Sequence, residues 1–114
     1  MPVVSDFIRI VGDSPKSIGN AAVELPFNTG GREASHDALL VFGVKGLNST
    51  VSVKVNNVVV GSLTPNATQT HWFTQQVYMG GSSIKDGNNE LQMEAVNNDG
   101  FEIKDVSCFF GQSA

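Results

Sequence analysis

The strongest constraint on the fold is an alternation of valines with polar residues near the middle of the chain. Over 51–55 every second residue is valine. This two-residue period is typical of a β-strand with one buried and one solvent-exposed face. Asn56-Asn57 follows, and three more valines occupy 58–60. Because two adjacent asparagines tolerate the positive φ angles of a type I′ turn, we expect residues 50–63 to form a tight β-hairpin.

A second alternation runs toward the C-terminus and changes phase on the way. Residues 91–95 alternate between apolar and polar, and the turn-forming run 97–100 separates them from the next apolar stretch. The apolar residues Phe101 and Ile103 are odd-numbered, whereas Val106, Cys108 and Phe110 are even-numbered. One extra residue would restore the facing of the strand, so we predict a β-bulge near Lys104-Asp105.

The remaining apolar segments also have the length of strands. Residues 39–44 are apolar at both parities, as in a central strand covered on both sides, and 3–11, 20–27 and 70–79 are further candidates. No stretch shows a sustained helical period with capping residues, and the 12 glycines favour tight turns. We therefore predict an all-β fold, a two-sheet antiparallel jelly-roll sandwich of about eight strands in a single domain over 1–114.

Charge and hydropathy argue against several classes of partner. The formal net charge is −4 and the 7 lysines and arginines are scattered, so we expect no nucleic-acid partner. Anionic membranes are disfavoured for the same reason, and no apolar run approaches the ~18 residues of a membrane span. No signal-peptide pattern is visible, so we expect a soluble protein, cytoplasmic by default. Cys108 is the only cysteine; it leaves no intrachain disulfide and is expected to be buried.

Three segments together resemble a known fold family. They are Ala38–Val44, then Val53–Gly61 with the pattern V-x-V-N-x-x-x-V-G, and Ile84–Met93 with a turn of the type L-x-x-G-x-N-x-L. They are similar to the galactose-binding-domain-like jelly rolls, which include many carbohydrate-binding modules and the sandwich domains appended to glycosidases. The resemblance implies this architecture and a binding function. It implies no ligand contacts, because no sugar-site motif matches residue for residue.

Patterns typical of catalysis and metal binding are weak. Ser35-His36-Asp37 contains the residue types of a hydrolytic triad, but neighbours on an extended chain point to opposite sides. His36 and His71 are the only histidines and lack the H-x-H spacing of metal-binding jelly rolls. We therefore predict neither an enzyme nor a cofactor. A structural calcium stays open as an alternative, with oxygen ligands from residues 86–90 or 97–99.

The most suggestive candidate site lies on the predicted strand 70–79. If its odd-numbered apolar residues face the core, then Trp72, Gln76 and Tyr78 project together from the opposite face. An aromatic ring can stack on the apolar face of a pyranose, while amides and hydroxyls bond its hydroxyl groups. Arg32, after the flexible run 29–31, is a further candidate at a loop tip. The alternative is that these aromatic residues pack under a loop or at a subunit interface.

These observations favour a non-catalytic binding module, lectin-like and specific for carbohydrate. The alternative, from a different class, is a structural or assembly protein that self-associates through an edge strand or an aromatic face, or docks on a partner protein. A small hydrolase ranks last, because no pair of carboxylates is marked out by apolar neighbours that would raise one pKa.

Overall fold

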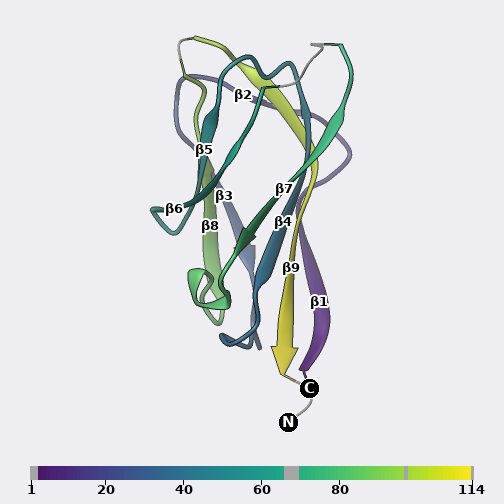
Figure 1. Cartoon of the computed structure of the whole chain (residues 1–114), viewed down its shortest axis with the longest axis vertical. Coiled ribbons are helices and arrows are strands. Elements are labelled where there is room, and N and C mark those ends of the chain that lie inside the picture. The colour runs from purple at the N-terminus through teal and green to yellow at the C-terminus, as the bar shows by residue number, and fades with distance from the viewer. Residues whose placement is uncertain (1–2, 66–69, 97, 114) are drawn as a thin grey trace.

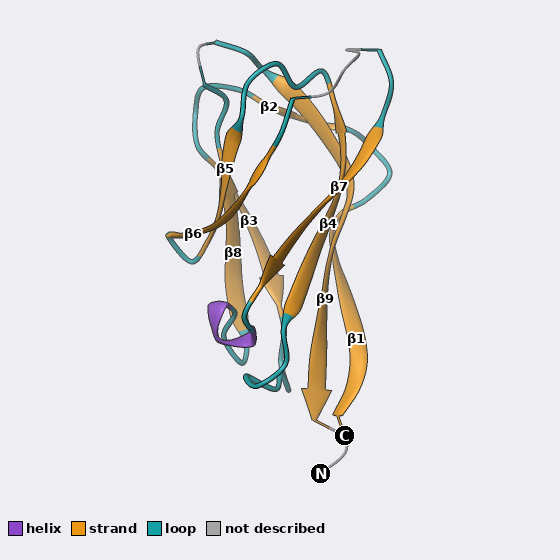
Figure 2. Ribbon diagram, viewed as in Figure 1, coloured by secondary structure: helices purple, strands orange, loops and turns teal. Residues whose placement is uncertain are grey.

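The computed structural model describes residues 3–65, 70–96 and 98–113 and shows two antiparallel sheets packed face to face (Figures 1 and 2). The predicted all-β fold is confirmed. Within the described residues there are nine strands, where about eight were expected, and a single turn of 3₁₀ helix, η1. Their bounds are β1 Val3–Val11, β2 Lys16–Ile18, β3 Val23–Asn28, β4 Ala38–Lys45, β5 Val51–Val55, β6 Val58–Leu63, β7 Phe73–Met79, η1 Gly81–Ser83, β8 Asn88–Met93 and β9 Phe101–Ser113.

The strand order is that of a jelly roll. The first sheet has the order β1-β9-β4-β7, with the short strand β2 paired to the start of β9, and the second has the order β3-β8-β5-β6. Apart from the β1–β2 succession and the β5–β6 hairpin, consecutive strands alternate between the sheets, as expected for this architecture. No helix within the described residues has the length and apolar character needed to span a bilayer.

The core lies between the two sheets and is filled by one parity of each strand. In β4 the even-numbered residues Leu40, Phe42 and Val44 are fully buried, and the valines of β5 face them from the other sheet. The odd-numbered residues of β4 are only half-buried. The expectation that residues 39–44 are covered on both sides is therefore wrong. β4 is central within its sheet, but the outer face of that sheet is at the molecular surface.

The predicted hairpin and the predicted bulge are both confirmed. Asn56 and Asn57 have φ angles of 52° and 68° between β5 and β6, as a type I′ turn requires. The register between β4 and β9 shifts by one residue between the pairs Val41–Ser107 and Gly43–Lys104, so β9 has one extra residue there. Asp105, in the extra position, has a φ of 50° and donates its N–H to the carbonyl oxygen of Gly12 (2.8 Å). The bulge thus turns the later apolar residues of β9 back into the core.

A buried asparagine joins the loops at one end of the sandwich. Asn89, at the start of β8, is 2% exposed and its side-chain oxygen accepts hydrogen bonds from the N–H of Lys85 (2.7 Å) and from Asn56 Nδ2 (2.9 Å). Its Nδ2 donates to Thr29 Oγ1 (2.8 Å) and to the carbonyl oxygen of Gly87 (3.0 Å). One amide therefore connects the β3–β4 loop, the loop before β8 and the β5–β6 turn. This explains the asparagine in the turn pattern of Ile84–Met93.

The edge strand β7 is held against β6 by close packing. A Cβ on Gly61 would lie 2.6 Å from Val77 Cγ1, so only glycine lets the two strands approach this closely. Next to this contact the Gln75 side chain accepts a hydrogen bond from the N–H of Thr64 (2.9 Å) and donates one to its carbonyl oxygen (2.8 Å). These contacts fix β7, which carries the candidate site, to the rest of the molecule.

Candidate functional site

The structure brings three of the four candidate residues to one face. In β7 the side chains of Val77 and Met79 are buried, while Gln76 and Tyr78 are exposed on the outer face of the first sheet. Trp72 immediately precedes β7, has the same parity and is half-buried. Six residues of extended chain separate Trp72 from Tyr78, a span of roughly 20 Å. The face is therefore long enough to contact several linked sugar rings.

Tyr78 ends an apolar row that crosses four strands. The cross-strand pairs are Phe7–Phe109, Phe109–Leu39 and Leu39–Tyr78, from β1, β9, β4 and β7. The rings of Phe7 and Phe109 are stacked, with centroids 5.5 Å apart. Phe7 is 58% and Tyr78 68% exposed. We name these four residues the apolar row. Sequence reasoning missed it because its members come from four separate segments, although Phe109 does have the parity opposite to its buried neighbours.

A shallow hollow adjoins the apolar row where β4 begins. Its volume is about 350 Å³, and Leu39 and Phe109 of the apolar row form part of its lining. Ser5, His36 and Asp37 add hydroxyl, imidazole and carboxylate groups. A lining that combines apolar residues with a few polar groups is the usual composition of a site that binds small polar molecules.

At the other end of β7 two lysines approach the indole ring of Trp72. Lys104 Nζ lies 4.4 Å and Lys45 Nζ 5.8 Å from the ring centroid. Lys45 belongs to β4, and Lys104 reaches the ring from β9 on the far side of β4. We name Trp72, Lys45 and Lys104 the cationic cluster. Exposed cation–π contacts of this kind contribute only about 0.5–1 kcal/mol each.

Arg32 does not join the other candidates. Its Nε donates to the carbonyl oxygen of Ile84 (2.9 Å), and its backbone forms an isolated bridge with Gln112 near the end of β9. Trp72 lies near the opposite end of β9, because Lys45 pairs with Glu102 there. Glu102 and Gln112 are ten residues apart on β9, roughly 30 Å. The loop folds back because Gly31 turns at a φ of 84°, so Arg32 anchors it rather than projecting from its tip.

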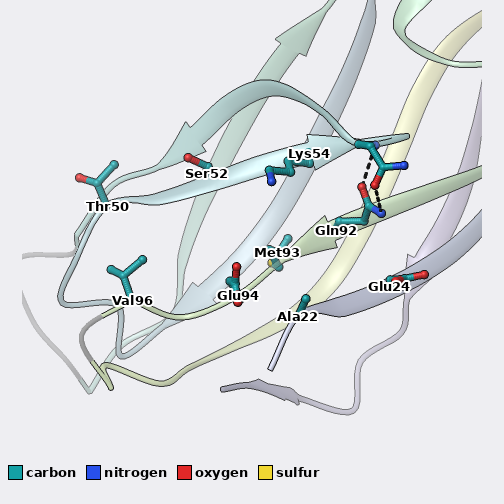
Figure 3. A pocket seen from close by; sticks show the side chains of 10 residues that line it. Ala22, Glu24, Thr50, Ser52, Lys54, Gln92, Met93, Glu94 and Val96 are labelled. Atoms are coloured by element: carbon teal, nitrogen blue, oxygen red, sulfur yellow. Dashed lines mark hydrogen bonds between the residues drawn. The ribbon is translucent and has the colours of Figure 1, made fainter. Parts of the chain in front are cut away.

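A groove on the outer face of the second sheet was not predicted. Its volume is about 380 Å³ (Figure 3). One cross-strand row places Gln92 of β8 between Glu24 of β3 and Lys54 of β5. Gln92 is held by two hydrogen bonds to Asn57, of 2.8 and 2.9 Å, which are drawn in Figure 3. The lining residues are Ala22, Glu24, Thr50, Ser52, Lys54, Asn57, Gln92, Met93, Glu94 and Val96. The alternating sequences of β5 and β8 indicated a solvent-exposed face but not its concave shape.

Two carboxylates meet on this second sheet. Glu90 of β8 and Glu24 of β3 lie on neighbouring strands of the same face. A hydrogen bond that the protonated Glu90 carboxyl donates to Glu24, together with the negative charge of Glu24, raises the pKa of Glu90 above its usual value. Two ionised carboxylates on neighbouring strands repel each other, so we expect this pair to favour the folded state more at acidic than at neutral pH.

Two of the carboxylates considered for calcium accept hydrogen bonds between loops. Asp86 Oδ1 accepts from the N–H of Gly31 (2.7 Å) and Asp99 Oδ2 accepts from Ser49 Oγ (2.7 Å). Asn97 lies outside the described residues. Within the part of the chain that the structure describes, no three His, Cys, Asp or Glu residues gather as a metal site would require.

The Ser35-His36-Asp37 segment does not have the geometry of a triad. Ser35 Oγ lies 3.2 Å from His36 Nδ1 and donates to Glu33 Oε1 (3.1 Å), so the serine stands between the other two groups. A triad requires the histidine in that central position. Hydrogen bonds from the backbone and the hydroxyl of Ser35 lower the pKa of Glu33. The cluster is exposed and closes the loop before β4.

The fold is similar to parts of solved carbohydrate-active proteins. The chain superposes on a BuGH86 protein in complex with neoagarooctaose (TM-score 0.71, 17% identity) and on a β-porphyranase of glycoside hydrolase family 86 from the human gut bacterium Bacteroides plebeius (TM-score 0.72, 13% identity). Each match covers 96% of this chain but only 19% and 21% of the other chain, so this chain spans about a fifth of their length.

A further match covers a whole domain. The CBM36-1 domain of a multidomain xylanase from the hindgut metagenome of Trinervitermes trinervoides is covered over 100% of its length, and 97% of this chain is used (TM-score 0.52, 13% identity). No protein-family model matches the sequence, and no curated protein does so at a significant level. The structural matches confirm the resemblance as one of fold: the chain has a two-sheet β-sandwich fold similar to that of the CBM36-1 domain.

Proposed function

We propose that the chain is a non-catalytic, lectin-like module that binds carbohydrate on the outer face of its first sheet. The observation that carries the proposal is the position of Tyr78. Tyr78 is 68% exposed at the end of the apolar row, and Gln76, two residues earlier in β7, is exposed on the same face. A pyranose presents an apolar face and a rim of hydroxyl groups, and this combination of ring and amide complements both.

In this proposal each part of the face has a separate task. Tyr78 and Phe109 stack against the apolar face of a sugar, while Gln76, with His36 and Asp37 from the hollow, exchanges hydrogen bonds with its hydroxyl groups. Trp72, roughly 20 Å away along β7, extends the site to a second part of the ligand. The ligand is therefore an oligosaccharide or a polysaccharide rather than a single sugar. Arg32, which is bonded to the Ile84 carbonyl, is left out of the proposed site.

The matched structures support the proposal. One is a GH86 protein in complex with neoagarooctaose and another is a CBM36 domain of a xylanase. The chain corresponds to a fifth of the first and to all of the second, so we infer that it acts as a binding domain beside a catalytic unit and carries no catalytic activity itself.

A glycan array tests the proposal with three variants. We expect the wild type to bind one class of oligosaccharide, and Tyr78→Ala to lose at least tenfold in affinity, about 1.4 kcal/mol, because a stacking surface is removed. Trp72→Ala is expected to weaken binding of long ligands more than of short ones. Val58→Ala is the matched control, because Val58 is 63% exposed on the β5–β6 hairpin, away from this face.

Near-UV circular dichroism checks that each variant is folded. The proposal is wrong if no glycan binds to the wild type, or if Tyr78→Ala binds as tightly as Val58→Ala does.

Self-association is a second candidate function, and the apolar row favours it. Phe7 and Phe109 are exposed and stacked on the outer face, and exposed apolar patches often mark contacts between proteins. Sedimentation velocity separates the two functions. A homodimer that dissociates in Phe7→Ser would support assembly, whereas a monomer that binds glycan through Tyr78 would exclude it.

A further inference from the structure

We propose that the cationic cluster makes this module selective for an anionic saccharide, one that carries sulfate esters or carboxylates. The inference rests on the proposed function, since it requires that carbohydrate binds on the outer face of the first sheet. It adds the chemical class of the ligand, which the fold alone does not provide.

Two ammonium groups from different strands converge on one ring. Lys45 ends β4, and Trp72 stands across from it because Val44 pairs with Phe73. Lys104 comes from β9 and reaches the same ring, with its Nζ 4.4 Å from the centroid. An aromatic ring flanked by two lysines presents a stacking surface and positive charge within a single sugar's reach.

Strand β4 leaves room for one of these lysines. Gly43 pairs with Lys104, and a Cβ on Gly43 would lie 3.3 Å from Lys104 Cγ and 2.9 Å from its backbone oxygen. Gly43 is not among the residues with positive φ, so its backbone does not require glycine. Its role is steric: the missing side chain lets the stem of Lys104 cross β4 toward Trp72.

The whole chain carries a net charge of −4, yet Lys45, Lys104 and the neighbouring Glu102 together sum to +1 at this end of the face. A locally positive site on an acidic molecule favours the binding of anionic ligands at that site, because the net negative charge of the rest of the molecule repels them.

An anionic ligand removes the competition between Lys104 and a sugar for the surface of the indole ring. The ammonium of Lys104 lies over the indole and would compete with a neutral sugar for that surface. A sulfate or carboxylate on the sugar offers each ammonium a charge-assisted hydrogen bond, which is stronger than an exposed cation–π contact. The lysines then move from the ring to the anion, and the indole becomes free to stack on the sugar. A neutral sugar also displaces the ammonium groups from the ring, but it offers them no charge-assisted hydrogen bond in exchange.

The test compares one oligosaccharide in two forms, prepared from a sulfated galactan and then chemically desulfated. By isothermal titration calorimetry we expect the sulfated form to bind at least tenfold more tightly at 50 mM salt. We expect this ratio to shrink at 500 mM salt, because exposed charges are screened. Lys104→Met and Lys45→Met should each reduce the ratio severalfold, and Gly43→Ala should do so by displacing Lys104.

Lys54→Met is the matched control, because it removes an exposed lysine from the other sheet and should leave the ratio unchanged. The fluorescence of Trp72, the single tryptophan, should change with the sulfated oligosaccharide and not with sodium sulfate alone. Equal affinity for both forms overturns the inference but leaves the proposed function standing. The inference is also overturned if Lys54→Met lowers the ratio as much as Lys104→Met. If neither form binds, and no other glycan does, both proposals fail together.

Discussion

Replacing the buried amide of Asn89 should have a large and calculable effect on stability. The side chain makes four hydrogen bonds of 3.0 Å or less, to Lys85, Asn56, Thr29 and Gly87. A buried hydrogen bond contributes about 1 kcal/mol net, so Asn89→Ala should lower the free energy of unfolding by ~3–4 kcal/mol. This is a large share of the ~5–15 kcal/mol that stabilises a typical domain.

The neighbouring residue provides a matched control. Asn88 is exposed, and its side-chain oxygen accepts one hydrogen bond, from Asn28 (3.0 Å). Asn88→Ala removes an identical side chain from the same strand, so we expect a loss of less than ~1 kcal/mol. Urea unfolding, followed by far-UV circular dichroism and by the fluorescence of Trp72, gives both free energies if the two signals coincide.

The difference between the free energies of unfolding of the two variants tests whether the Asn89 side chain holds the loops together. If Asn89→Ala costs no more than Asn88→Ala, the four bonds do not hold the loops together, and the explanation of the turn pattern is wrong. A double-mutant cycle with Thr29→Ala adds detail. The coupling free energy between Asn89 and Thr29 should exceed that between Asn88 and Thr29.

Three further outcomes follow from single contacts. Burial raises the pKa of Cys108 to about 12, so the native thiol stays protonated at pH 8, and a thiol reagent such as DTNB should react only upon unfolding; rapid labelling of the folded protein would contradict this. The raised pKa of Glu90 means that its contribution to stability is present below its unfolded pKa and is lost as the pH rises through its folded pKa. Glu24→Gln should therefore raise the melting temperature at pH 7 and change it little at pH 3, and an equal change at both pH values would disprove the repulsion. Gly61→Ala should destabilise by about 1–3 kcal/mol because its Cβ meets Val77 at 2.6 Å, and Val77→Ala should offset part of that loss; the steric explanation fails if the two effects simply add.

Local sequence signals predicted the features that depend on local chemistry. The hairpin at 50–63 follows from a two-residue period and from Asn56-Asn57, which take the positive φ angles that the turn needs. The phase change along β9 predicted the bulge at Asp105 for an equally local reason, since an extra residue reverses the facing of every later side chain.

Features that depend on distant partners could not be predicted. Whether both faces of residues 39–44 are covered depends on what lies outside the sheet, and the apolar row needs the pairing of β1 with β9. The residues around Arg32 have the composition of a mobile loop tip. Its guanidinium, however, donates a hydrogen bond to the carbonyl oxygen of Ile84, far along the chain. Parity along β7 did predict that Trp72, Gln76 and Tyr78 share a face. It gave no sign that two lysines approach the indole ring.

The most direct test of the central proposal is a ¹H–¹⁵N NMR titration with the oligosaccharide that binds best on the array. Carbohydrate binding on the first sheet predicts chemical-shift changes concentrated at Gln76, Tyr78 and Phe109, with little change at Lys54 and Gln92 in the groove of the second sheet. Shift changes gathered at the groove, with none around Tyr78, would contradict it.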